Sequence, residues 1–206
     1  MLLVIDYQMG NVGSILNMLK KIGCPARVSR DPQEIRQAEK LILPGVGAFD
    51  AGMRNLSDLG LIEVLNARVR QDRTPLLGIC LGMQLFSRRS EEGVLPGLGW
   101  IEAETKAFSF AGTDQRLKIP HMGWNTVAIK PGEALFEPMP PDPRFYFVHS
   151  YHVVCAHAEH VAAVTHYGID FCSALRCGNI CGVQFHPEKS HKYGMQLLAN
   201  FCRADG

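Results

Sequence analysis

The stretch that decides the fold is Pro75-Leu76-Leu77-Gly78-Ile79-Cys80-Leu81-Gly82-Met83-Gln84-Leu85. It begins with a continuous apolar run, which is typical of a buried parallel strand. A Gly-x-Cys-x-Gly turn and a helical pattern follow. A sharp strand-to-helix turn of this kind presents its central residue as a nucleophile and needs small neighbours, because a Cβ would clash there. The stretch therefore predicts a strand, a tight turn and a helix, with Cys80 at the turn.

Cys80 is expected at the carboxyl end of the strand and the amino end of the helix. Free backbone N–H groups and the helix dipole at such a position favour a thiolate over a thiol. The alternative is a buried structural cysteine, which is the common state of a lone cysteine. Taken alone, the Gly-x-Cys-x-Gly motif does not decide between these two roles.

A second stretch, Gly182-Val183-Gln184-Phe185-His186-Pro187-Glu188, supplies an imidazole and a carboxylate. A thiolate mechanism needs a base that takes and returns a proton, and an acidic residue that orients the base. Residues two apart in an extended segment point to the same side, but Pro187 argues against a regular strand. We therefore expect only that His186 and Glu188 lie near each other. His149 and His152 are rival bases, and His149 is interpreted as a structural histidine in a core strand.

A third stretch, Pro44-Gly45-Val46-Gly47, follows a predicted buried strand at 41–43. Its two glycines let the backbone approach a ligand closely and expose N–H groups. An attacked amide needs such donors, because its oxygen becomes an oxyanion. The N–H of Leu81, directly after the nucleophile, is the expected second donor. An ordinary turn without a ligand is the alternative.

Length and composition favour a single domain over 1–206, because the chain has 206 residues and 47% hydrophobic content. The net charge is +1, from 21 basic and 20 acidic residues, which excludes an electrostatic case for nucleic acid or an anionic membrane. The first six residues are apolar but too short for a membrane span, and they lack a signal-peptide pattern. Cytoplasmic residence is therefore the expectation.

Seven cysteines at irregular spacing argue against a disulfide framework and fit a reducing compartment. Cys172, Cys177, Cys181 and His186 suggest a zinc site, but their spacing contains no CxxC pair. Core packing is the better interpretation of these sulfurs. We expect no metal and no cofactor.

Strands and helices alternate in the first half of the chain. A strand is predicted at 2–5, a helix from a Ser14 cap through Lys21, a helix starting at the Asp31 cap, and a helix over 61–69. After Glu91, turn signals at short spacing favour antiparallel strands, and the expected segments are 126–129, 145–148, 152–155, 161–165, 171–175 and 181–184, with a short stretch at 116–119 and a closing helix over 190–201. The prediction is an α/β fold with a three-layer open sheet, mostly parallel in the N-terminal half with added antiparallel strands.

The pairing of Gly78-Ile79-Cys80-Leu81-Gly82 with His186-Pro187-Glu188 resembles the class I, or triad, glutamine amidotransferases. Further motifs in the same order are similar to those of the glutaminase subunit of imidazole glycerol phosphate synthase in histidine biosynthesis. They are Ile5-Asp6-Tyr7 with Gly10-Asn11, Leu43-Pro44-Gly45-Val46-Gly47-Ala48-Phe49, Pro120-His121-Met122-Gly123-Trp124-Asn125, and Phe185-His186-Pro187-Glu188-Lys189-Ser190. The resemblance spans nearly the whole chain and implies a flavodoxin-like fold.

The resemblance also implies roles for individual residues. Cys80, His186 and Glu188 would hydrolyse glutamine through a thioester, and the ammonia would pass to a cyclase subunit in a heterodimer. The oxyanion hole would come from Gly45, Val46, Gly47 and Leu81, and Gln84 would contact the substrate. The residues expected at the partner interface are Asn11, Pro120, His121, Met122, Gly123, Trp124, Tyr146 and Lys189.

Two departures from the family pattern keep alternatives open. Tyr151-His152 stands where relatives often have two tyrosines, and Asn11-Val12-Gly13-Ser14 lacks the basic residue that many relatives carry. One alternative is a paralogue that feeds ammonia to a sugar-modifying synthase for surface polysaccharides. The other is a stand-alone cysteine hydrolase on a similar scaffold.

Overall fold

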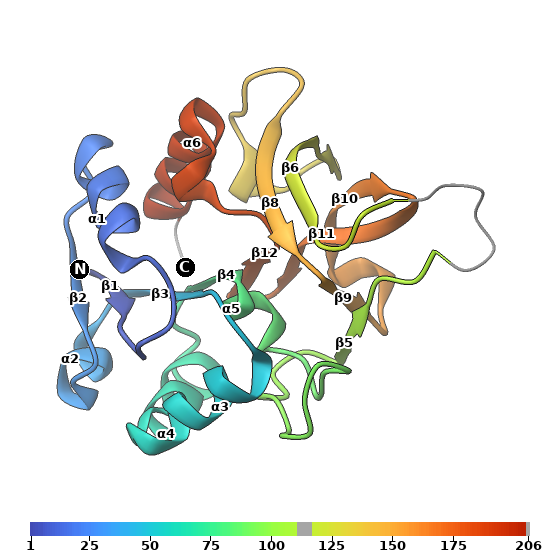
Figure 1. Ribbon diagram of the computed structural model, residues 1–206. Helices are drawn as coiled ribbons and strands as arrows, with labels where there is room; N and C mark the ends of the chain where they lie inside the picture. The colour runs from blue at the N-terminus through green and yellow to red at the C-terminus, as the bar shows by residue number, and fades with distance from the viewer. Residues whose placement is uncertain (111–116, 205–206) are drawn as a thin grey trace.

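Strand β4 (Leu76–Cys80) lies in the middle of a large mixed sheet in the computed structural model, which describes residues 1–110 and 117–204 (Figure 1). The strand order is β2-β1-β3-β4-β12-β11-β10-β7. The bounds are β1 Leu2–Ile5, β2 Ala26–Ser29, β3 Lys40–Gly45, β7 Ala128–Ile129, β10 Val161–Tyr167, β11 Ile169–Cys177 and β12 Ile180–Val183. Strands β2, β1, β3, β4 and β12 run parallel, and β11, β10 and β7 continue the sheet antiparallel. The predicted α/β class is confirmed.

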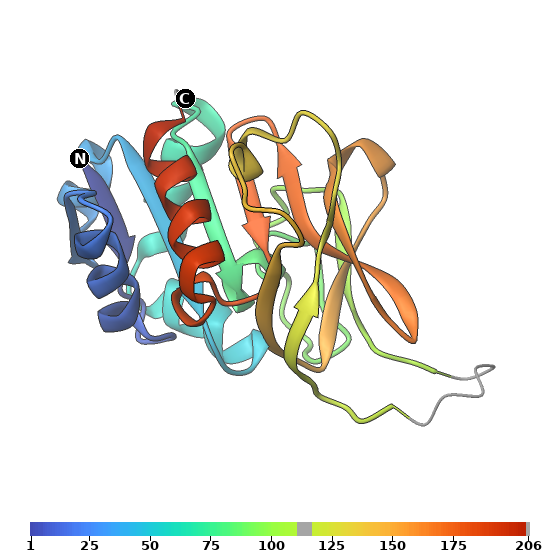
Figure 2. The same cartoon turned by 90° about the horizontal axis from the view of Figure 1, so that it is seen from above.

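Helices cover both faces of the parallel part, giving three layers (Figures 1 and 2). One face carries α1 (Val12–Lys21) and α6 (His191–Arg203), and the other carries α2 (Pro32–Gln37), α3 (Phe49–Asp58) and α4 (Leu61–Asn66). Side chains alternate along a strand, so Leu77 and Ile79 pack in the cluster of α1 and α6, whereas Leu76 packs in that of α3 and α4. Burial on both faces explains the continuous apolar run of β4.

The second half of the chain adds a β-rich lobe beside β11 and β10 (Figure 1). Strand β5 (Ala103–Ala107) pairs with β9 (Tyr151–Cys155), which also pairs with β11. Strands β6 (His121–Thr126) and β8 (Arg144–His149) form a separate antiparallel pair. Short 3₁₀ turns lie at Ala134–Phe136, Ala158–His160 and Pro187–Lys189.

Several element predictions need correction. Helix α1 begins at Val12 with Asn11 as its cap, and Ser14 lies inside the first turn and donates its N–H to Asn11 Oδ1 at 3.1 Å. The strand expected at 126–129 is reduced to β7, and β6 ends where that strand was expected to begin. The predicted helix over 61–69 continues from α4 as a π turn, Ala67–Gln71. Arg116, part of the short stretch at 116–119, lies outside the described residues.

Strand β12 differs from its prediction in direction. It was expected among the added antiparallel strands, but it pairs parallel with β4 in the register Val183 to Ile79 and antiparallel only with β11. It therefore belongs to both halves of the sheet. This position brings the segment that follows β12 next to the end of β4.

The structure contains one disulfide, although the irregular cysteine spacing argued against a disulfide framework. Cys24, after α1, forms a disulfide with Cys202 in α6, across a sequence separation of 178. Spacing carries no information about a pair so distant. Cys172, Cys177 and Cys181 are free, and the described residues contain no group of three or more His, Cys, Asp or Glu side chains placed to hold a metal. None of the helices in the described ranges has the length and apolar content needed to cross a bilayer.

Candidate active site

Cys80 occupies a strained turn at the end of β4. Its backbone has φ +53° and ψ −110°, in a region that residues with a Cβ rarely adopt, and it immediately precedes α5 (Leu81–Gln84). A Cβ on Gly78 would collide with the ring of Phe86, and one on Gly82 would collide with the carbonyl oxygen of Leu43. Both glycines are therefore required sterically, and they hold Cys80 at the carboxyl edge of the sheet, 7% exposed.

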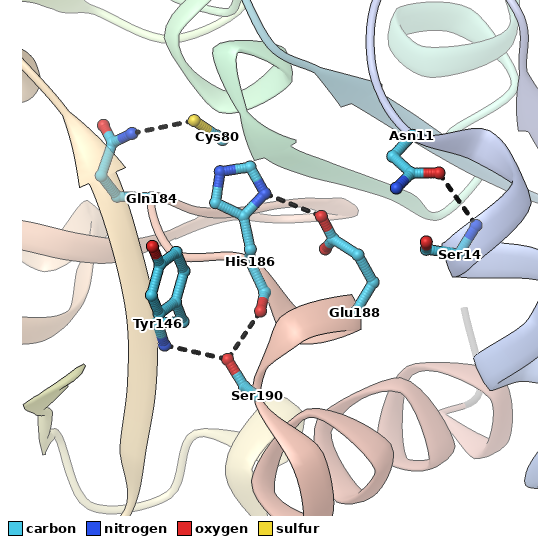
Figure 3. Close-up of polar contacts among 8 residues, drawn as sticks. All are labelled: Asn11, Ser14, Cys80, Tyr146, Gln184, His186, Glu188 and Ser190. Atoms are coloured by element: carbon cyan, nitrogen blue, oxygen red, sulfur yellow. Dashed lines mark hydrogen bonds and ion pairs between the residues drawn. The ribbon is translucent and has the colours of Figure 1, made fainter. Parts of the chain in front are cut away.

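The segment after β12 brings His186 beside Cys80. Figure 3 shows the imidazole between the Cys80 sulfur and the Glu188 carboxylate, with Nε2 on the side of the sulfur. His186 Nδ1 lies 2.8 Å from Glu188 Oε1, and the two side chains are 1% and 3% exposed. Nε2 of His186 has no hydrogen-bond partner within the described residues. The ring is therefore oriented by Glu188 on one side and free toward the thiol on the other.

The charge state of His186 follows from these neighbours. Burial alone would lower the pKa of the imidazole, but the interactions with the nearby Cys80 sulfur and the Glu188 carboxylate outweigh it and raise the pKa of His186 to about 10. At neutral pH the ring is then an imidazolium. A cysteine facing an imidazolium is the arrangement in which a thiolate is stabilised.

Backbone contacts fix the position of His186. Its N–H donates to the Tyr146 carbonyl of β8 at 2.9 Å. Ser190 Oγ donates to the His186 carbonyl at 2.6 Å and accepts the Tyr146 N–H at 3.0 Å. Pro187 begins the 3₁₀ turn that carries Glu188. The expected proximity of His186 and Glu188 is thus achieved by a turn rather than by a strand.

A cleft of about 360 Å³ opens beside the thiol. It is lined by Val46, Gly47, Cys80, Leu81, Gln84, Glu92, Pro120, Val148, His149, Ser150 and Tyr151. The structure therefore brings four of the predicted substrate-side residues, Val46, Gly47, Leu81 and Gln84, together with the cysteine. Gly45 pairs with Cys80 across β3 and β4 but does not line the cleft.

Gln84 lies in the cleft wall with its amide nitrogen already engaged. Its Nε2 donates to the Tyr151 carbonyl at 3.0 Å and to Gln184 Oε1 at 3.0 Å. Both amide hydrogens are then used within the protein, since a primary amide has two. A ligand in the cleft can meet only the oxygen of Gln84.

The predicted interface residues separate into two groups. Met122 and Trp124 of β6 are 61% and 48% exposed. Trp124 stacks on His191 with 5.4 Å between ring centroids, and Lys189 Nζ lies 5.7 Å above the ring of Tyr146. These residues and Gly123 form one apolar and basic surface, here called the β6 face. The other group lies elsewhere: Asn11 caps α1, Pro120 lines the cleft, and His121 is buried at 3% exposure.

Two polar residues near the thiol, Glu92 and Gln184, were given no role by the sequence patterns. Glu92 lines the cleft, and its Oε2 accepts the Phe49 N–H at 2.8 Å. Gln184 is fully buried, and its Nε2 lies 3.7 Å from Cys80 Sγ. Gln184 could have been predicted to face Cys80, because it lies two residues before His186 and alternate residues of an extended segment share a side. Glu92 comes from a loop with no pattern that marks it.

The amino-acid sequence is similar to that of proteins in a family of glutamine amidotransferases. A family model described as glutamine amidotransferase class-I matches residues 3–204. The chain is 54% identical over 203 residues to imidazole glycerol phosphate synthase subunit HisH 2 of Methanococcus maripaludis, covering 98% of this chain and 99% of the relative. It is 49% identical over 201 residues to subunit HisH 2 of Pseudomonas aeruginosa, covering 98% of each.

Solved structures share the fold at low sequence identity. PurLQS from Thermotoga maritima aligns with a TM-score of 0.71 and 14% identity, covering 97% of this chain and 96% of that one. The glutaminase domain of Trypanosoma brucei CTPS aligns with a TM-score of 0.66 and 15% identity, covering 100% of this chain and 94% of that one.

Proposed function

The chain belongs to the class I glutamine amidotransferases, within the group of imidazole glycerol phosphate synthase subunits HisH, and from that premise we propose that Cys80, His186 and Glu188 hydrolyse glutamine to glutamate and ammonia. The observation that carries the proposal is the buried His186–Glu188 contact of 2.8 Å, with the free Nε2 facing the Cys80 sulfur (Figure 3). The single domain over 1–206 contains every residue that this chemistry needs.

The first half of the reaction is acylation of the cysteine. The Cys80 thiolate attacks the side-chain carboxamide carbon of glutamine and forms a C–S bond. The carbonyl electron pair moves onto oxygen, and the N–H of Leu81 together with the backbone at Val46 and Gly47 stabilises that oxyanion. The imidazolium of His186 gives its proton to the departing nitrogen, and ammonia leaves as the C–N bond breaks.

The second half is hydrolysis of the thioester. His186 is now neutral and takes a proton from water, which attacks the acyl carbon. The C–S bond breaks, glutamate is released, and the thiolate and imidazolium are restored. Throughout the cycle Glu188 keeps Nε2 aimed at the reacting atoms and compensates the imidazolium charge. A cleft of about 360 Å³ is of the size expected for a small ligand.

The ammonia is delivered to a cyclase subunit in a heterodimer that makes imidazole glycerol phosphate and the aminoimidazole carboxamide ribotide of histidine biosynthesis. Support comes from the β6 face, where Met122 and Trp124 are exposed and the Tyr146 ring contacts both Trp124 and Lys189. Aromatic and methionine side chains are enriched at the centres of protein interfaces. The glutaminase is proposed to reside in the cytoplasm; the free thiol of Cys80 fits a reducing compartment, whereas the Cys24–Cys202 disulfide does not.

The test is glutamate release from glutamine by the chain alone, then with the histidine-pathway cyclase subunit and an acceptor analogue. We expect a large rise when both are added. Cys80→Ala should abolish release, whereas Cys172→Ala, a buried free cysteine on β11, should retain it. Release by Cys80→Ala would refute the nucleophile. Cys80-dependent release that the cyclase leaves unchanged would refute this partner and favour a different synthase.

A further inference from the structure

Gln184 is a second buried side chain that contacts the sulfur of Cys80. Its Nε2 donates toward Cys80 Sγ at 3.7 Å, within the longer range of hydrogen bonds to sulfur. Figure 3 shows the nitrogen of this amide and the His186 ring next to the sulfur. Gln184 is 0% exposed and does not line the cleft. It therefore acts on the thiol from within the protein.

Gln84 determines which end of the Gln184 amide faces the sulfur. An amide can rotate by half a turn and present its oxygen instead of its nitrogen. Gln84 Nε2 donates to Gln184 Oε1 at 3.0 Å, so the oxygen of Gln184 is held away from Cys80 and the NH₂ group faces it. A rotated amide would place its one oxygen, an acceptor, against the thiolate, and would turn its N–H groups toward the N–H donor of Gln84. The observed orientation is the one that favours negative charge on sulfur.

The orientation of Gln84 is itself determined by a carbonyl that only accepts. Gln84 Nε2 donates to the Tyr151 carbonyl at 3.0 Å, and His149 Nδ1 lies 2.8 Å from the same oxygen. Nδ1 of His149 therefore carries the hydrogen, which leaves its Nε2 as an acceptor. That Nε2 lies 3.0 Å from His121 Nδ1, which must then be the donor. Finally Asn125 Nδ2 lies 3.3 Å from His121 Nε2.

This order of donors and acceptors requires both histidines to be neutral. Gln84, His149 and His121 are 5%, 6% and 3% exposed, so these three side chains are largely shielded from bulk water. Burial lowers the pKa of His149 to about 3 and that of His121 to about 4. At neutral pH the network therefore has one arrangement of hydrogens. A fully satisfied buried network of this kind fixes the geometry of its members.

We propose that Gln184 is a positioning residue for the Cys80 thiolate, and that Gln84, the Tyr151 carbonyl and the His149–His121 pair hold the Gln184 amide in its donating orientation. The inference deepens the proposed function, because it assigns the other contact of the same nucleophile. His186 supplies and removes protons, and Gln184 fixes the direction of the sulfur and favours its charge. Gln84 consequently has a second role besides presenting its oxygen to the cleft.

The test measures thiolate formation at Cys80 without requiring turnover. Alkylation by iodoacetamide is followed from pH 5 to pH 10, and the Cys80 peptide is quantified by mass spectrometry so that other cysteines do not contribute. Gln184→Met removes the donor, and we expect the half-maximal pH of alkylation to rise by roughly 0.5–1 unit. Gln184→Glu places a carboxylate against the sulfur, and we expect a rise of about 1 unit or more.

Steady-state kinetics add a second readout. For Gln184→Met we expect kcat for glutamine to fall about 10-fold, with KM changed less than about 3-fold, because the side chain lies outside the cleft. Gln84→Met should raise the alkylation pH in the same direction. Gln196→Glu is the matched control, since this amide lies on α6 and contacts Asn200 at 2.8 Å, away from the network. It should leave the alkylation profile in place.

An unchanged alkylation profile in folded Gln184→Met overturns the proposal. If Gln184→Glu does not fold, Gln184→Met and Gln84→Met still decide the question. The outcome is separable from the proposed function, because alkylation needs no glutamine. If Gln184→Met shifts the alkylation profile but the parent chain releases no glutamate, the positioning role is supported and the glutaminase assignment is refuted. If the parent chain releases glutamate but Gln184→Met leaves the profile unshifted, the glutaminase assignment is supported and the positioning role is refuted.

Discussion

Replacing Glu188 by Gln removes one negative charge from the active site and leaves the shape of the side chain in place. Oε1 of Glu188 lies 2.8 Å from Nδ1 of His186, and the carboxylate is 3% exposed, so water screens little of this interaction. A glutamine oxygen at the same position still accepts the Nδ1 hydrogen. The substitution therefore isolates the contribution of the charge.

The expected loss follows from the strengths of the two kinds of hydrogen bond. A hydrogen bond to a charged group contributes about 1.5–3 kcal/mol and a neutral one about 0.5–1.5 kcal/mol. The difference of about 1–1.5 kcal/mol raises the activation free energy of the step in which His186 carries a charge. This corresponds to a fall in kcat by a factor of about 10. Glu188→Ala loses the whole hydrogen bond and the ring orientation, and we expect a factor of about 100. KM should change little, since Glu188 does not line the cleft.

The pH dependence gives a second measure of the same charge. Burial opposes the imidazolium, and the contacts with Cys80 and Glu188 outweigh it to give His186 a pKa of about 10. Removing the Glu188 charge lowers that pKa, so the imidazolium is lost at a lower pH. The alkaline limb of kcat should therefore move toward neutral pH in Glu188→Gln.

The assay is glutamate release between pH 5 and pH 10, with circular dichroism and thermal unfolding as checks on the fold. Asp58→Asn is the control, because it removes the same charge from an exposed position on α3. A Glu188→Gln chain with parental kcat and an unmoved alkaline limb would refute the assignment of Glu188 as the group that supports His186.

Three further predictions concern stability, and each is measured by urea unfolding. Gly82→Ala should cost about 3 kcal/mol, because its Cβ meets a backbone carbonyl that cannot move aside; Gly13→Ala, in an open position of α1, should be neutral or stabilise by about 0.5–1 kcal/mol, and equal effects would contradict the steric argument. Lys40→Met should cost about 1–3 kcal/mol, because its Nζ donates to carbonyls at the end of α6 at 3.0 and 2.7 Å. The lowered pKa values of His121 and His149 predict stability that is fully present above the unfolded pKa of about 6.5 and is lost as pH falls toward about 4 and about 3; His149→Gln should flatten this slope, and an unchanged slope would show that the histidine is not buried neutral.

The elbow was predictable because its determinants are local. Gly78 and Gly82 flank Cys80 in sequence, and the same residues make the steric contacts that permit the turn. The buried strand before the elbow could also be predicted, because its continuous apolar run is local in the sequence. The cap of α1 was predicted three residues too late, because Asn11 and Ser14 are both good caps and only the backbone shows which side chain accepts the N–H.

Features that depend on segments distant in the sequence could not be predicted from local patterns. Helix α3 has no side-chain cap and begins directly after the glycine-rich loop, so the sequence lacks the start signals used elsewhere. Strand β6 was not among the predicted strands, because its side chains alternate in burial only once β8 pairs with it. The direction of β12 depends on its neighbours, and the contact between Gln184 and Cys80 exists only because β12 lies beside β4.

The adjacency of β4 and β12 also determines when the enzyme becomes reactive during its synthesis. Residues 81–179 separate the two strands, and closing a loop of about 100 residues costs roughly 2 kcal/mol more than closing one of about 10. The ribosome releases β1 to β4 first, and N-terminal units fold first. At that stage Cys80 has neither His186 nor Gln184 beside it. The nascent chain therefore carries an unactivated thiol, and its reactivity toward substrates and oxidants begins only when the last strand and helix have emerged.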